Sequence, residues 1–134
     1  MRSWSRLRRG ASAVELALVL PILGLLFVFA VDFARLYYHY SIVTNCARNG
    51  ALWASDPTAA QFSPYANCTA AALADASNLS PQPTVSSPYY SPDGTYVQVT
   101  VTYPFTTITN YPGLPNPINL TRMVQMSMAP ATPN

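Results

Sequence analysis

An apolar run at residues 11–31, ASAVELALVLPILGLLFVFAV, constrains this chain more than any other feature of its sequence. As an α-helix with a rise of 1.5 Å per residue it is about 31 Å long, close to the hydrocarbon thickness of a bilayer. Its one charged residue is Glu15. A carboxylate near the bilayer centre costs roughly 2.5–3.5 kcal/mol on insertion scales. The run therefore predicts a transmembrane helix whose acidic residue is retained for a function.

Charge is distributed unevenly about this run. Four of the seven basic residues precede it, namely Arg2, Arg6, Arg8 and Arg9. Positive residues beside a span favour the cytoplasmic side, so we expect a single-pass protein with its N-terminus in the cytoplasm and its remainder outside. From Ala11 onward three arginines stand against five acids, a balance of 3 − 5 = −2, so no nucleic-acid partner is expected.

The helical pattern continues beyond the span. Apolar residues recur at steps of three or four from Phe33 to Ala54, and Asp56-Pro57 then ends the helix. We therefore divide the chain into four segments. These are a basic leader (1–10), a transmembrane segment (11–31), an amphipathic extension of the same helix (32–55) and an extracytoplasmic region (56–134).

The extracytoplasmic region reads as a mixture of helix and strand. Ser63-Pro64 resembles the start of a short second helix ending near Asn78, and an edge strand is expected around 84–90. Residues 95–105 and 118–128 alternate as strands do, with Arg122 as an exception on the apolar face, and Pro104 suggests an edge or a terminus. The expected fold class is α+β: a long N-terminal transmembrane-to-amphipathic helix, a short second helix, and an antiparallel sheet of two to three strands packed on the helix extension.

Catalytic chemistry has little support. His39 is the only histidine and has no evident acid–base partner, the acids are scattered, and no glycine-rich phosphate loop follows a strand. We therefore expect no enzyme, no cofactor and no metal site.

Cys46 and Cys68 both fall on the non-cytoplasmic side, where disulfides are permitted. A bridge would close a loop of about 23 residues and stabilise the fold by roughly 3–4 kcal/mol. The alternative is two small, free, buried thiols. We favour the disulfide on the compartment alone.

Gly10, Ala11 and Glu15 suggest a processing and assembly site. A cut after Gly10 would leave a free amine on Ala11, one helical turn before Glu15. In a bundle of such helices, the carboxylate of one subunit can compensate the amine of a neighbour, which specifies the register. The alternative is that Glu15 lies near the membrane surface and reaches out to water.

These residues resemble a known family. Residues 9–21, RGASAVELALVLP, are similar to the start of TadE-like pseudopilins of bacterial tight-adherence (Tad, Flp or type IVc) pilus systems. The resemblance continues through residues 32–35 and 44–51 and reaches the strand that ends at 103–105. Cys46 and Cys68 are not part of that family pattern.

The resemblance implies a function. It implies cleavage after Gly10 by a prepilin peptidase, with Glu15 as the acid used in assembly. The expected product is a minor pilin in the bacterial cytoplasmic membrane, supporting or entering a type IV pilus or a related secretion system. Its expected partners are the peptidase, other pilins or pseudopilins, the assembly platform and membrane lipid.

Two other interpretations stay open. In one, the chain is an uncut, signal-anchored membrane protein whose outer domain binds a partner. In the other, signal peptidase cuts after Ala30 and releases a soluble protein, which would leave 31–55 as a free helix.

Overall fold

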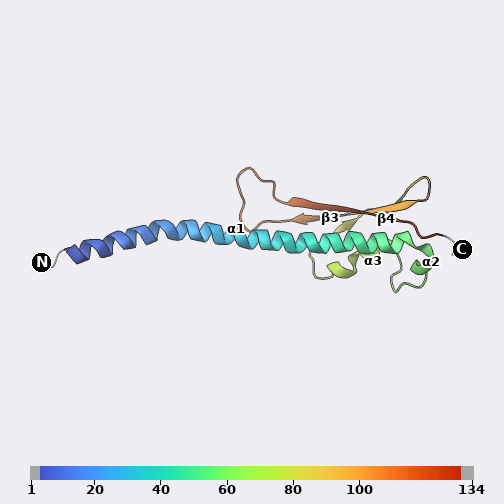
Figure 1. Cartoon of the computed structure of the whole chain (residues 1–134), viewed down its shortest axis with the longest axis horizontal. Coiled ribbons are helices and arrows are strands. Elements are labelled where there is room, and N and C mark those ends of the chain that lie inside the picture. The colour runs from blue at the N-terminus through green and yellow to red at the C-terminus, as the bar shows by residue number, and fades with distance from the viewer. Residues whose placement is uncertain (1–3, 131–134) are drawn as a thin grey trace. The chain divides into compact units, whose positions relative to one another are not determined.

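A computed structural model describes the backbone of residues 4–130 and the side chains of residues 10–130. The chain divides into two compact units, Met1–Arg35 and Leu36–Asn134. The long helix α1 (Trp4–Ser55) contributes to both. The second unit adds the elements α2 (Pro57–Ala60), α3 (Cys68–Leu73), the 3-10 turn η1 (Ala74–Ala76), β1 (Thr84–Val85), β2 (Tyr89–Tyr90), β3 (Tyr96–Phe105) and β4 (Ile118–Ser127) (Figure 1). The predicted α+β fold class is confirmed.

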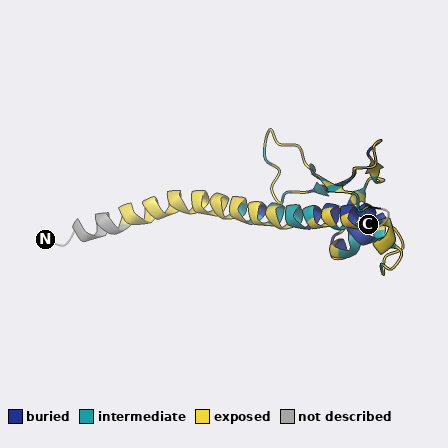
Figure 2. Cartoon of the chain, turned by 45° about the vertical axis from the view of Figure 1, so that its right-hand side comes forward, coloured by how far each residue is buried: buried dark blue, intermediate teal, exposed yellow. Residues whose placement is uncertain are grey.

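In the first unit, α1 is an apolar helix whose side chains are exposed from Gly10 to Phe27 (Figure 2). By length and composition α1 can cross a membrane once. The helix begins at Trp4, within the segment 1–10 that the sequence set apart as a basic leader. Arginine, leucine and alanine are good helix formers, and no proline precedes Pro21, so the residues from Trp4 to Gly10 can be helical. Apart from Gly10, the leader's side chains lie outside the described residues.

The end of α1 at Ser55 agrees with the prediction. Asp56 then caps α2: its Oδ1 accepts hydrogen bonds from the backbone N–H of Thr58 at 3.0 Å and of Ala59 at 2.9 Å. Pro57 stands at the first position of α2, where its missing N–H costs nothing. The residues that stop one helix therefore start the next, which the sequence analysis did not foresee.

The predicted start of the second helix at Ser63-Pro64 was wrong. This helix is α3, and Asn67 caps it by accepting a hydrogen bond from the Ala70 N–H at 2.8 Å. Ser63 instead accepts one from the Tyr65 N–H at 3.2 Å, within the loop. That loop is held to α1, because the Trp53 indole N–H donates to the Tyr65 carbonyl at 3.2 Å. The N-cap of this helix is therefore Asn67, four residues after Ser63.

The sheet is antiparallel, with β3 at its centre. One side of β3 pairs with β4, in a register that sets Val99 opposite Val124, and the other side pairs with β1 and β2. The expected edge strand at 84–90 is therefore present but broken into two, which gives four strands. Pro104 is not on an edge strand: it lies near the end of β3, beyond Thr102, the last residue of β3 that pairs with β1. There its missing N–H removes no ladder bond.

The core forms where the sheet covers the second part of α1, from Leu36 onward (Figure 1). The inner face of β3 is buried along its whole length. From α1 it meets buried residues at steps of three or four, namely Val43, Cys46, Ala47, Ala51 and Ala54. Tyr37 lies between Phe33 and Ala54, the bounds of the predicted apolar stripe, but is 66% exposed. The apolar stripe is therefore buried only in part. The predicted packing of the sheet on the helix extension is confirmed.

Candidate processing and assembly site

Gly10, Ala11 and Glu15 lie where the described side chains of α1 begin, and all three are exposed. No atom lies within 4 Å of the place where a Cβ on Gly10 would stand. Ala11 and Glu15 are four residues apart, so their side chains lie on the same face of the helix, one turn from each other. The structure therefore presents the three residues as an open surface on one helical segment.

A charge pair that the sequence analysis missed lies further along the same unit. The Arg35 guanidinium donates a hydrogen bond to the Asp32 carboxylate at 3.2 Å, and Asp32 is only 5% exposed. Their spacing of three residues on a helix was the signal that could have revealed it. The pair compensates the charges of Asp32 and Arg35 just after the apolar run. Within residues 11–31, Glu15 is the one acid.

Cys46 and Cys68 are both buried, as free thiols, in the second unit. The Cys68 thiol donates to the Gly50 carbonyl at 3.4 Å. The disulfide is not seen in this structure and stays a prediction. Burial, together with the charge of Asp75, raises the pKa of the Cys46 thiol to about 11, and burial also raises the pKa of Cys68.

In the reduced protein, we expect Cys46 to resist alkylation at pH 8. A pKa of about 11, against an ordinary value of 9.0, leaves a thiolate fraction roughly 100-fold smaller than in the unfolded chain. Because the pKa of Cys46 is higher in the folded chain than in the unfolded chain, Cys46 does not change the free energy of unfolding below about pH 9. As pH rises towards 11, the free energy of unfolding falls. Iodoacetamide labelling followed by mass spectrometry, with the urea-unfolded reduced chain as control, measures this. Equal rates in both states would contradict the buried position of Cys46.

His39 belongs to a packed aromatic cluster. Its ring stacks on Tyr103 with centroids 5.2 Å apart and tilts against Phe105 at 5.3 Å. Tyr38 meets it edge-on at 5.6 Å. Within the described residues no group of three or more histidines, cysteines or acids lies close enough to hold a metal ion. His39 thus has a packing role between α1 and β3.

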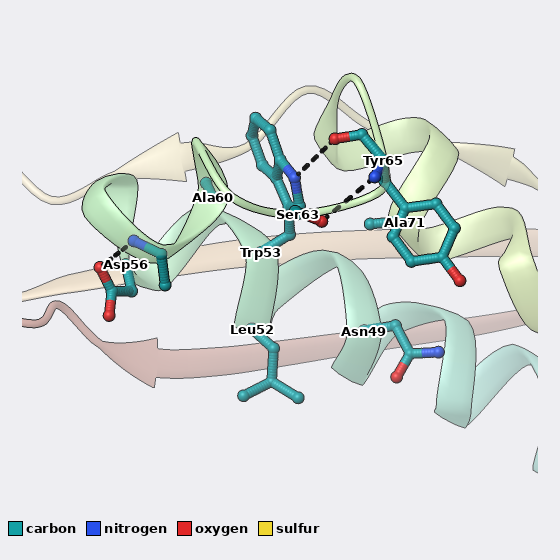
Figure 3. Close-up of a pocket in the computed structure, with 9 residues that line it drawn as sticks. Asn49, Leu52, Trp53, Asp56, Ala60, Ser63, Tyr65 and Ala71 are labelled. Carbon is teal, nitrogen blue, oxygen red and sulfur yellow. Dashed lines mark hydrogen bonds between the residues drawn. The ribbon is translucent and has the colours of Figure 1, made fainter.

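A cavity of about 370 Å³ opens beside Trp53, between α1, α2 and the loop before α3 (Figure 3). Its polar groups are engaged in the fold: Asp56 caps α2, and the Asn49 amide donates to Asp75 at 2.9 Å. The Trp53 N–H is bonded to the Tyr65 carbonyl. Ser63 and Asp56 also line this cavity, and each accepts a backbone hydrogen bond within the fold.

Comparison with known proteins bears on the first unit and on the start of the second. No curated protein and no solved structure matches this chain. A family model matches residues 10–52. This range includes Gly10, Ala11 and Glu15, the Asp32–Arg35 pair and most of the helix extension. Residues 10–52 match the model of the family described as TadE-like protein, which confirms the resemblance that the sequence predicted.

Proposed function

We propose that this chain is a TadE-like pseudopilin, a membrane-anchored structural subunit that supports assembly of a tight-adherence type IV pilus or a related secretion system. One observation carries the proposal. The family match at residues 10–52 coincides with an exposed apolar helix that holds Gly10, Ala11 and Glu15 on open turns. A single apolar helix of this kind fits a membrane-anchored component of such a system.

In the proposed first step, a prepilin peptidase hydrolyses the bond between Gly10 and Ala11. Water adds to the Gly10 carbonyl, the C–N bond breaks, and the amine leaves on Ala11. Glycine costs a helix about 1 kcal/mol relative to alanine, so Gly10 lowers the free energy needed to unwind the helix locally at this bond. The open space around Gly10 leaves room for an approaching enzyme.

In the proposed second step, the new amine and Glu15 organise a bundle of subunits. Each subunit offers one cation and one anion about a turn apart on the same helix. In lipid either charge alone is costly, and pairing between neighbours compensates both. The arginines ahead of the span would hold the N-terminus in the cytoplasm, and the second unit would project from the outer face. Such a unit can enter the fibre or stay at its base.

N-terminal sequencing of the protein purified from membranes of its own cells is expected to begin at Ala11. Cells that lack the prepilin peptidase should yield Met1 instead, because the cut depends on that enzyme. Gly10→Leu should also preserve Met1, because a bulky side chain at the cleaved bond is expected to prevent cleavage. Gly24→Leu is the matched control, and it should leave cleavage unchanged. A chain that keeps Met1 in peptidase-containing cells would overturn the proposal.

The alternative function, an uncut signal-anchored protein with a partner-binding outer domain, is favoured by a different observation. The sheet of the second unit has a long strand, β4, that pairs on one side only within the described chain. On this reading Met1 persists and Glu15→Leu is harmless to function.

A further inference from the structure

The outer side of β4 is a long, open sheet edge. β4 runs from Ile118 to Ser127 and, within residues 4–130, pairs with β3 alone. An unpaired strand edge presents N–H and C=O groups that can template another strand. Such an edge is a candidate docking surface if its backbone groups and its side chains both suit a partner.

The hydrogen bonds around β3 show which residues of β4 point outward. The Met128 N–H donates to the Thr95 carbonyl at 2.9 Å, one step beyond the pair of Tyr96 and Ser127. Bonded pairs alternate in an antiparallel ladder, so every second residue of β4, from Ile118 to Met126, bonds to β3. Thr100 supports this assignment: it faces Met123 in register, yet exchanges its bonds with Ser86 on the opposite side, at 2.9 and 3.1 Å.

The remaining residues of β4 therefore aim their backbone N–H and C=O groups away from the sheet. They are Asn119, Thr121, Met123, Gln125 and Ser127, and all of them are exposed. None is charged and none is proline. Charged side chains and proline are what usually protect an open edge from pairing, and these outward positions have neither.

The inner face of β4 is incompletely covered. On β3 every inward side chain from Val97 to Phe105 is buried, whereas on β4 the inward Ile118, Val124 and Met126 are only partly buried. These partly buried residues pack against the core and border the open edge. The inward side chains of a strand added beside β4 would pack against Ile118, Val124 and Met126 and would bury them further.

Arg122 determines which kind of side chain the added strand needs opposite it. It points inward, and its guanidinium carbon lies 4.8 Å from the centre of the Tyr40 ring. Its Nε is buried and has no hydrogen-bond partner among the described residues. A buried donor without an acceptor is unfavourable, and a carboxylate is the strongest acceptor for a guanidinium. A carboxylate on an added strand would compensate the charge of the guanidinium, whereas an apolar or basic neighbour would not.

A second copy of β4 is a poor occupant for this edge. An antiparallel pair of two such strands centred on Arg122 would set two guanidinium groups opposite each other, and like charges directly opposed are destabilising. The charge thus disfavours self-pairing in this register and favours a chain that carries the opposite charge.

We propose that β4 accepts an added β-strand from a different protein chain, and that this strand carries an aspartate or glutamate facing Arg122. The partner would bind through backbone hydrogen bonds at Thr121, Met123 and Gln125, which give affinity with little side-chain preference. The inward carboxylate would give the specificity. This surface belongs to the second unit, so the proposal holds whether or not the chain is cut after Gly10.

The test uses the full chain in detergent micelles and short fluorescent peptides of alternating valine and threonine. One peptide carries glutamate in place of its central valine, and a matched peptide carries lysine there. Fluorescence anisotropy is expected to show the glutamate peptide binding at least about tenfold more tightly than the lysine peptide. Arg122→Met should remove this preference, because the variant lacks the group that recognises the carboxylate.

Proline variants test the role of the backbone. Thr121→Pro with Met123→Pro should abolish binding but keep the fold by circular dichroism, because these N–H groups make no bond to β3. Thr121→Val with Met123→Val is the matched control, since it changes the same side chains, keeps both N–H groups and should bind as the unchanged protein does. Failure of the unchanged protein to bind the glutamate peptide, or equal binding by the proline variant, would overturn the proposal. Self-association that the proline variant abolishes would show that the occupant is a second copy instead.

Discussion

Changing Glu15 to alanine is expected to abolish assembly of this chain with its neighbours while leaving its insertion into the membrane intact. Insertion should become easier, because the carboxylate costs roughly 2.5–3.5 kcal/mol near the bilayer centre. Assembly should fail, because the Ala11 amine would be buried without its counter-charge. Removing one partner of a buried ion pair costs about 3–5 kcal/mol, which is a factor of 100 or more in the assembly equilibrium. Crosslinking in whole cells, followed by membrane fractionation, measures both outcomes.

One variant separates the charge of Glu15 from its shape, and a second serves as its control. Glu15→Gln keeps the size and one oxygen acceptor but not the charge, and should fail almost as completely as alanine. Val14→Ala is the matched control: Val14 is the preceding residue, and its side chain is also exposed on the helix. It should assemble normally. Crosslinked complexes of Glu15→Ala at the level of the unchanged protein would contradict the proposed role, and would favour an acid that merely reaches the membrane surface.

The long periodic elements of this protein could be predicted from its sequence. Strict alternation over residues 95–105 located β3 to within one residue, and Asp56-Pro57 fixed the end of α1 at Ser55. The alternation of β4 also placed Arg122 on the apolar face, where the structure has it. Such patterns report burial directly, because the side-chain period of a strand or helix is fixed by backbone geometry.

What could not be predicted depends on contacts between distant segments. Pro104 suggests an edge strand or a strand terminus when read alone. It lies near the end of β3, a central strand, and is tolerated there because β1 pairs with β3 only as far as Thr102, while β4 still pairs Asn119 with Pro104. α3 starts at Cys68 with Asn67 as its cap, after a loop that Trp53 holds by a hydrogen bond to the Tyr65 carbonyl, and no local pattern shows that long-range bond. At the candidate site, the sequence named Gly10, Ala11 and Glu15, but the unsatisfied Nε of Arg122 and the open edge of β4 appear only once the sheet order is known.

Gly50 is the position where a substitution should damage the second unit most. A Cβ placed there would lie 3.1 Å from both the Ala72 Cβ and a Val99 methyl carbon, and 3.4 Å from the Cys68 sulfur. Ala72, Val99 and Cys68 come from α3 and β3 and are themselves buried, so α1, α3 and β3 meet at this glycine. A Cβ at this position therefore requires Ala72 and Val99 to move by a few tenths of an ångström, and a larger side chain requires more.

Gly50→Leu is therefore expected to destabilise the second unit by about 3 kcal/mol or more, since overpacking a tight core typically costs 1–3 kcal/mol and this site has no room to relax. Gly50→Ala should be far milder, because its overlap is offset by about 1 kcal/mol of helix propensity. Urea unfolding of the full chain in micelles, followed by near-ultraviolet circular dichroism, measures both. The control is Gly24→Leu, where no atom lies within 4 Å of the added Cβ, and it should leave this transition unchanged. A Gly50→Leu midpoint equal to that of the unchanged chain would mean that α1 does not pack against α3 and β3 as closely as described.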